Sequence, residues 1–172
     1  MPKRILLFIV LVLFMAIYGF VNADSLLLGP ECFGRQYSNT TVNISMAEIT
    51  PFNGHDLYTL YAQIFLPEGA KITSMVVFYY DNNNYAEIRV GLYRRNLYDK
   101  LGQTIIPEWS STDSATDPMI TKRTNVNWAY NKILNRACTY HVKLTFYTIS
   151  MPIDFTNMQF YGLKIFYMPP TS

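Results

Sequence analysis

Four stretches of the chain alternate apolar and polar residues with a period of two. They run over residues 57–66, 87–95, 140–147 and 159–167. Because successive side chains of a strand point to opposite faces of its sheet, this period predicts strands that are buried on one face only. No amphipathic helical pattern of useful length follows residue 24, so these stretches restrict the chain to an all-β fold.

Aromatic residues strengthen the prediction of strands. The chain holds 14 Tyr and 11 Phe, and aromatic side chains suit the pleated, half-buried surface of a sheet. Residues 72–80 are almost continuously apolar or aromatic, which indicates a strand covered on both faces. The Asn-rich residues 81–84 form a predicted turn, so residues 72–95 are expected to make a β-hairpin.

The last alternating stretch carries a specific expectation about orientation. Its apolar side chains should all lie on one face of their strand; they are Tyr161, Leu163, Ile165 and Tyr167. Weaker strands are predicted at residues 42–46, 103–109 and 119–125. About six to eight short strands separated by turns favour a jelly-roll-like antiparallel β-sandwich over a barrel, in one domain over residues 24–172.

Residues 1–23 have the organisation of a cleavable signal peptide. Lys3 and Arg4 precede an uncharged apolar run that ends at Val21, and Val21 and Ala23 supply the small residues before a cleavage site. The alternative is a retained membrane anchor, because the run is close to the shortest length that spans a bilayer. Either way, we expect the protein to be secreted, periplasmic or on the cell surface.

The charge balance argues against a nucleic-acid partner. Lys3 and Arg4 lie in the predicted signal peptide, so 12 of the 14 Lys and Arg remain beside 12 Asp and Glu. The mature chain is therefore close to neutral, whereas nucleic-acid binders concentrate basic charge. A membrane would be contacted only through residues 1–23, if they are not cleaved.

Two cysteines, Cys32 and Cys138, remain in the mature chain. In an oxidising compartment an even pair predicts a disulfide. It would close a loop of about 100 residues and stabilise the fold by roughly 4–5 kcal/mol in the chain-entropy model. The alternative is two free, buried thiols, and the wide spacing matches no zinc site.

Three segments resemble a group of secreted bacterial β-sandwich proteins that share an LPxGAxIT…YYDN…LYR core. They are residues 66–75 (LPEGAKITSM), 79–82 (YYDN) and 90–94 (VGLYR), and residues 160–167 (FYGLKIFY) match the closing strand of that group. The residues concerned are structural, and most members of the group have no assigned activity. The resemblance therefore implies a bacterial source and a β-sandwich, and it implies no activity.

No catalytic centre is apparent in the sequence. The two histidines, His55 and His141, have no nucleophile motif beside them, and the glutamates occur singly. No sequence motif for a metal ion or a cofactor is present. We therefore expect a non-enzymatic protein without a cofactor, and a hydrolase is only a third alternative.

Both tryptophans, Trp109 and Trp128, fall in residues 96–137, the least patterned part of the mature chain. Long connections in compact domains are usually functional or disordered, and disordered segments usually lack such aromatics. We expect one indole to be partly exposed and the other to pack inward. Trp109, Trp128 and Tyr93 are the candidate ligand-binding residues of an exported module that binds a glycan or a surface protein. The alternative is a structural subunit that self-associates in a cell-surface or extracellular layer.

Overall fold

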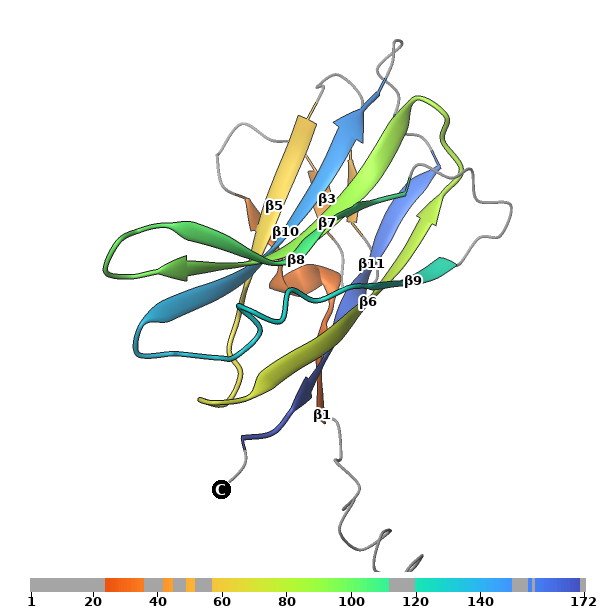
Figure 1. The fold of residues 1–172 in the computed structure, drawn as a ribbon. Coiled ribbons are helices and arrows are strands. Elements are labelled where there is room, and N and C mark those ends of the chain that lie inside the picture. Colours follow the sequence, from red (N-terminus) through yellow and green to blue (C-terminus); the bar gives the residue numbers. More distant parts are fainter. Residues whose placement is uncertain are drawn as a thin grey trace, which may run out of the picture.

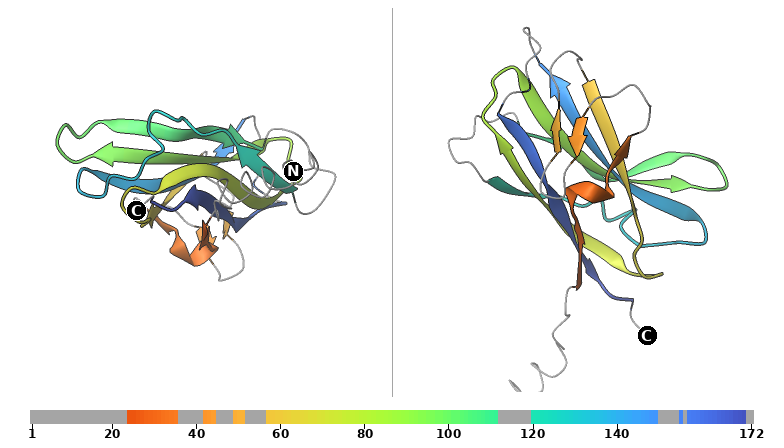
Figure 2. Two further views of the ribbon diagram at one scale, coloured as in Figure 1. Left: turned by 60° about the horizontal axis from the view of Figure 1, so that its bottom comes forward. Right: turned by 180° about the vertical axis from the view of Figure 1, so that it is seen from behind.

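The computed structural model describes residues 24–35, 42–44, 49–51, 57–111, 120–149, 155 and 157–170. They form two antiparallel β-sheets that enclose one hydrophobic core (Figures 1 and 2). The predicted class, an all-β antiparallel sandwich, is confirmed. The predicted signal peptide and His55 lie outside the described residues. Among the described residues, no helix has the length and apolarity that crossing a membrane requires.

The first layer is a six-stranded sheet. Its strand order is β3 (Val42–Ile44), β4 (Ile49–Pro51), β11 (Met158–Met168), β6 (Lys71–Asp81) and β9 (Ile120–Thr124). A further strand, β1 (Asp24–Leu28), pairs with the later part of β11 and is followed by the short 3-10 helix η1 (Pro30–Cys32). The short strands β1 and β4 were not predicted, because short segments carry too little alternation to be recognised.

The second layer is a five-stranded sheet. Its strand order is β2 (Gly34–Arg35), β5 (Leu57–Ile64), β10 (Cys138–Thr148), β7 (Ala86–Asn96) and β8 (Gly102–Ser110). Strand β10 is central and pairs along most of its length with β5 on one side and with β7 on the other. Strands β8 and β9 confirm the two weak strands predicted at residues 103–109 and 119–125.

Residues 72–95 do not form the predicted hairpin. Strand β6 pairs with β11 and β9, whereas β7 pairs with β10 and β8, so the turn between them crosses from one sheet to the other. The predicted turn itself is present: Asn83 N–H donates to Asp81 Oδ1 at 3.1 Å, and Tyr85 N–H donates to Asn83 Oδ1 at 2.7 Å. Such local bonds form equally in a hairpin and in a crossing, so the sequence pattern could not distinguish them.

The core is built from the inward side chains of both sheets. The predicted alternation is confirmed in β5, β7 and β10, where each inward side chain is buried. These side chains are Tyr58, Leu60, Ala62, Ile64, Ile88, Val90, Leu92, Tyr140, Val142, Leu144 and Phe146. Burying apolar area at this scale is the main term that favours folding.

In β11 the predicted alternation is wrong at Tyr161. The ladder with β6 shifts between Phe160 and Gly162, and this bulge places Phe160 and Leu163 in the core while Tyr161 stays partly exposed. Gly162 has a φ of +130°, and a Cβ there would lie 2.7 Å from the carbonyl oxygen of Leu28. The glycine thus permits both the bulge and the close approach of β1.

The predicted disulfide is not formed: Cys32 and Cys138 are both free. Cys32 is exposed at the end of η1, where the next residue, Phe33, packs edge-on against Phe160 of the six-stranded sheet with ring centroids 5.1 Å apart. Cys138 is buried in the core at the start of β10. Because one thiol faces solvent and the other lies in the core, the two side chains do not meet.

The connection from β9 to β10 is tied to both sheets. Ile133 exchanges backbone hydrogen bonds with the turn before β6, through Gly69 N–H at 3.0 Å and Ala70 carbonyl oxygen at 2.8 Å. Asn127 N–H donates to the carbonyl oxygen of Ile105 in β8 at 2.7 Å. The described part of the 96–137 segment is therefore two strands and an anchored connection.

Candidate functional site

The outward-pointing side chains of β5, β10 and β7 form a continuous polar and aromatic surface. Register brings them together: His141 of β10 lies between Gln63 of β5 and Tyr93 of β7. We call this surface the outer face; its members are Tyr61, Gln63, Tyr93, Arg95, Thr139, His141 and Lys143. It alternates along each strand with residues of the core, so the same strands build the interior and the candidate site.

Three aromatic rings from three neighbouring strands form a row on the outer face. The His141 ring lies 5.6 Å from that of Tyr61 and 5.7 Å from that of Tyr93, and it is nearly parallel to the latter, at 17°. The Tyr93 ring lies flat against the strand over Gly91: a Cβ at Gly91 would be 2.8 Å from the ring. The absence of a side chain at Gly91 therefore lets a flat ring cover the strand.

A pocket of about 560 Å³ opens beside this row. Its walls combine ring faces with a guanidinium, an amide and a hydroxyl group; the lining residues are Gly34, Tyr61, Gln63, Arg95, Thr139, Tyr140 and His141. Burial, followed by the charge of Arg95, lowers the pKa of His141, so the imidazole is uncharged at neutral pH. Such a site can hold a polar molecule that also has an apolar face.

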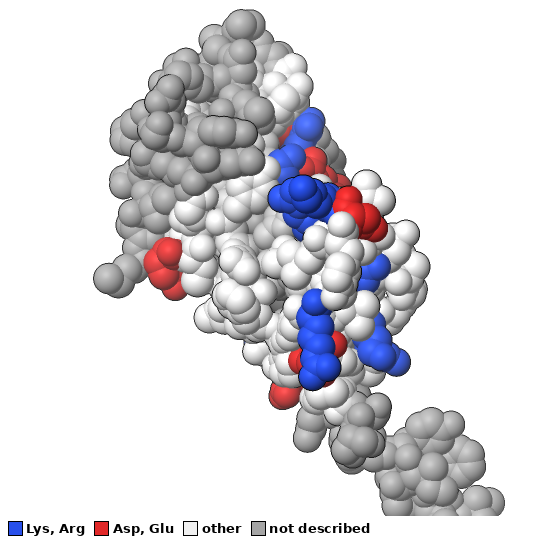
Figure 3. All heavy atoms as spheres, turned by 90° about the vertical axis from the view of Figure 1, so that its left-hand side faces the viewer, with Lys and Arg blue, Asp and Glu red and all other residues white. Residues whose placement is uncertain are grey.

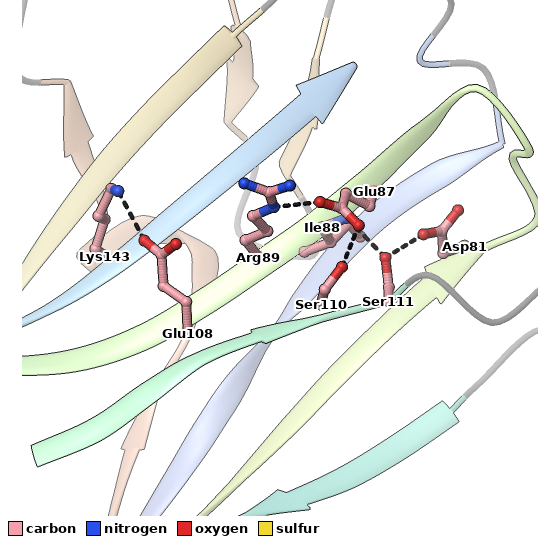
Figure 4. A network of polar contacts seen from close by, with 8 residues as sticks. All are labelled: Asp81, Glu87, Ile88, Arg89, Glu108, Ser110, Ser111 and Lys143. Carbon is pink, nitrogen blue, oxygen red and sulfur yellow. Dashed lines mark hydrogen bonds and ion pairs between the residues drawn. The ribbon is translucent and has the colours of Figure 1, made fainter. Parts of the chain in front are cut away.

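Ion pairs hold the polar side chains of the neighbouring strand in place (Figure 4). Lys143 Nζ lies 2.7 Å from Glu108 Oε1, and Tyr93 also hydrogen-bonds Glu108. Burial alone would raise the pKa of Glu108, but the hydrogen bond and charge of Lys143, with the Tyr93 bond, hold it below its usual value. Burial and Glu108 together raise the pKa of Tyr93. The Tyr93 ring is thus fixed by its hydroxyl group.

A second, smaller depression of about 340 Å³ lies at β7 and β8; it is lined by Glu87, Arg89, Glu108, Trp109 and Ser110. Glu87 is buried and accepts hydrogen bonds from Arg89 and Ser110, and the Arg89 guanidinium lies 3.9 Å from the centre of the Tyr147 ring. Figure 4 shows that the residue after Glu87, Ile88, donates its backbone N–H to Ser111 Oγ, and that Ser111 donates in turn to Asp81. Every charged group of this depression thus has a partner.

The predicted site residues do not gather in one place. Tyr93 lies on the outer face, whereas Trp109 packs against the core with its ring 4.9 Å from that of Tyr79. Trp128 is 68% exposed in the β9–β10 connection and lines neither pocket. One indole is therefore exposed and the other packs inward, as expected; their role in binding stays a prediction.

Sequence reasoning missed Tyr61, Arg95 and the binding role available to His141. His141 occupies a polar position of the alternating stretch 140–147, which predicts an outward orientation, and the structure confirms this orientation. The sequence pattern did not predict that β5, β10 and β7 are neighbours in one sheet. This pairing brings together residues that are far apart in the chain.

Charge is mixed on the side of the molecule drawn in Figure 3. Lys and Arg side chains lie beside Asp and Glu there, and most of the described surface in that view is uncharged. Within the described part of the chain, no three His, Cys, Asp or Glu side chains cluster in a way that could hold a metal ion.

The sequence matches no protein-family model, and no curated protein is significantly similar to it. A solved xylan-binding module, CBM15, has a similar fold: its TM-score is 0.51 at 11% identity, over 88% of this chain and 100% of the module. A module specific for non-crystalline cellulose, CBM28, matches with a TM-score of 0.42 at 8% identity, over 83% of this chain and 89% of the module. At 11% identity the likeness to the xylan-binding module shows a shared β-sandwich fold.

Proposed function

We propose that this protein is an exported, non-enzymatic carbohydrate-binding module whose glycan lies on the outer face of the five-stranded sheet. The observation that carries the proposal is the row of Tyr61, His141 and Tyr93 beside a pocket of about 560 Å³. Aromatic rings offer flat apolar surfaces on which the C–H faces of a sugar ring can stack.

Polar groups at fixed positions supply the second requirement of sugar recognition. Gln63 and Thr139 line the pocket and offer an amide and a hydroxyl group to sugar hydroxyls. The rings are held by contacts within the protein, Tyr93 through its bond to Glu108 and His141 between its two neighbours. A site that is ordered before binding loses less entropy when the ligand arrives.

The carboxylates near the site favour binding over hydrolysis. Glycoside hydrolysis needs one carboxylic acid with a raised pKa to protonate the leaving oxygen. The pKa of Glu108 is instead held below its usual value, chiefly by Lys143 against the effect of burial. Glu87 is only 2% exposed and is bonded to Arg89 and Ser110. Neither group is suited to act as the proton donor.

A glycan array followed by titration calorimetry tests the proposal. Tyr61→Ala and Tyr93→Ala should each weaken binding of the best glycan by about tenfold or more, since each removes one stacking surface. The matched control is Tyr98→Ala, which removes a 79% exposed tyrosine from the β7–β8 turn, outside the outer face. Absence of any glycan ligand, or undiminished binding by both outer-face variants, would contradict the proposal.

A second candidate function, self-association, is favoured by one observation. Apolar side chains are exposed together in the turn between β7 and β8, namely Leu97, Tyr98 and Leu101. Exposed apolar clusters often mark protein contacts. Sedimentation equilibrium of the wild type and of Leu101→Lys tests this alternative: a dimer or larger assembly that the variant dissociates supports it, and a monomeric wild type excludes it.

A further inference from the structure

Arg95 differs from Lys143, the other cation of the outer face, in having no carboxylate partner in the described part of the chain. Lys143 pairs with Glu108 at 2.7 Å. Arg89, in the neighbouring depression, pairs with Glu87. Arg95 is exposed at the pocket, and no ion pair joins it to another residue in the described part of the chain.

Among the described residues that line it, the pocket that contains Arg95 carries positive charge and no compensating acid. None of its lining residues is Asp or Glu; apart from Arg95 they are neutral, because burial and Arg95 itself lower the pKa of His141. An anionic ligand group would therefore gain charge interaction there without displacing an existing partner.

The position of Arg95 relative to the rings fits a charged group carried by a sugar. Arg95 follows Tyr93 by two residues on the same face of β7 and is paired with Thr139, while His141 is paired with Tyr93. Two residues along a strand span about 7 Å, so Arg95 leaves the backbone roughly the length of one sugar ring away from Tyr93. A sugar stacked on the rings can thus direct a substituent to Arg95.

Resting on the proposed function, we propose that the glycan contains uronic acid and that Arg95 binds the carboxylate of one such unit. The guanidinium presents a planar fork of N–H donors that matches a carboxylate with two parallel hydrogen bonds. One guanidinium suits one charge per bound sugar. The uncharged faces of the same sugar remain available for the Tyr61 and His141 rings.

The test uses pairs of oligosaccharides that differ only in the carboxylate. Mature wild-type protein is titrated with oligogalacturonate, oligomeric alginate and glucuronoxylan fragments, and with the carboxyl-reduced form of each. The acidic member of at least one pair should bind tenfold or more tightly than its reduced form. Arg95→Gln should abolish that preference, so that the acidic form binds no more tightly than its reduced form, and Arg95→Lys should retain part of the preference.

The controls separate a specific contact from general charge and from loss of the site. Lys164→Gln removes one positive charge from β11 in the other sheet and should not alter the preference. Equal binding of acidic and reduced forms, lost in Tyr61→Ala but unaffected in Arg95→Gln, would refute the role of Arg95 and leave the proposed function standing. Binding of sulfated but not uronic glycans through Arg95 would refute the carboxylate assignment. Failure of every glycan to bind would refute both proposals.

Discussion

Replacing Asp81 by Asn should lower the free energy of unfolding at acidic pH and raise it at neutral pH. Asp81 is only 2% exposed, at the crossing from β6 to β7. Burial raises the pKa of its carboxyl group from 3.8 to about 6, although hydrogen bonds from Ser111, Asn83 and Ile88 oppose the rise and the charge of Glu87 adds to it.

The size of the effect follows from the pKa difference. A shift of about two units, at roughly 1.4 kcal/mol per unit, corresponds to about 3 kcal/mol. Because the folded carboxyl has the higher pKa, the native state binds more protons than the unfolded state between pH 3.8 and about 6. Stability contributed at Asp81 is therefore complete below that window and declines as the pH rises through it.

The Asp81→Asn substitution would remove this decline at the cost of one hydrogen bond. The introduced amide oxygen can still accept from Asn83 N–H, but the amide nitrogen would face Ser111 Oγ, which already accepts from Ile88 N–H at 2.7 Å. Losing the Ser111 bond costs about 1 kcal/mol. Asp81→Asn should therefore be about 0.5 kcal/mol less stable than the wild type near pH 4, where part of the decline has already occurred, and about 2 kcal/mol more stable near pH 7.

Urea unfolding of both proteins at intervals from pH 4 to pH 8 measures the difference. Asp99→Asn is the matched control: Asp99 also accepts from the backbone N–H two residues ahead, at 2.9 Å to Leu101, but it is exposed. If the free-energy difference between Asp81→Asn and the wild type is the same at every pH, the carboxyl group is not perturbed by burial and the reasoning is wrong.

Three further outcomes are expected. Gly162→Ala should lower the free energy of unfolding by about 3 kcal/mol, because the methyl group meets the β1 backbone at a positive φ, whereas Gly102→Ala, with nothing within 4 Å, should change it little. Trp128→Phe should remove most of the tryptophan fluorescence that iodide quenches in the wild type, since this indole is 68% exposed. Cys32 should be alkylated in the folded, unreduced protein and Cys138 only after unfolding; mass spectrometry that finds both blocked would restore the disulfide.

The fold was predictable because its signal is local. An alternating strand such as residues 140–147 carries its own evidence of an inward and an outward face. In β10 the predicted inward side chains are all buried, although Thr145 of the outward face is buried too. The errors arose where one residue or one pairing choice decides the outcome. The bulge at Gly162 shifts the alternation by one residue. The turn after Asp81 allows the next strand either to pair with β6 in the same sheet or to cross to the other sheet.

The candidate site was less predictable because its signal is not local. Tyr61, Tyr93 and His141 become neighbours only through the order β5, β10, β7, and no feature of any single strand specifies that order. Trp109 and Trp128 were the natural candidates by residue type. Their separation follows from β8, which directs Trp109 toward Tyr79, while Trp128 lies in a connection that faces solvent.

The central position of β10 has a consequence for how the chain reaches its native state. Tyr140 pairs with Ile64 on one side and Arg94 on the other, so both neighbours of β10 are synthesised well before it. Until β10 inserts, the facing edges of β5 and β7 carry unpaired backbone groups that can pair with another molecule. Closure over such sequence separations is slow. The yield of soluble protein should therefore fall as the time between synthesis of β7 and synthesis of residues 138–148 grows. Coexpressing residues 138–148 as a peptide should cover the open edges and raise that yield.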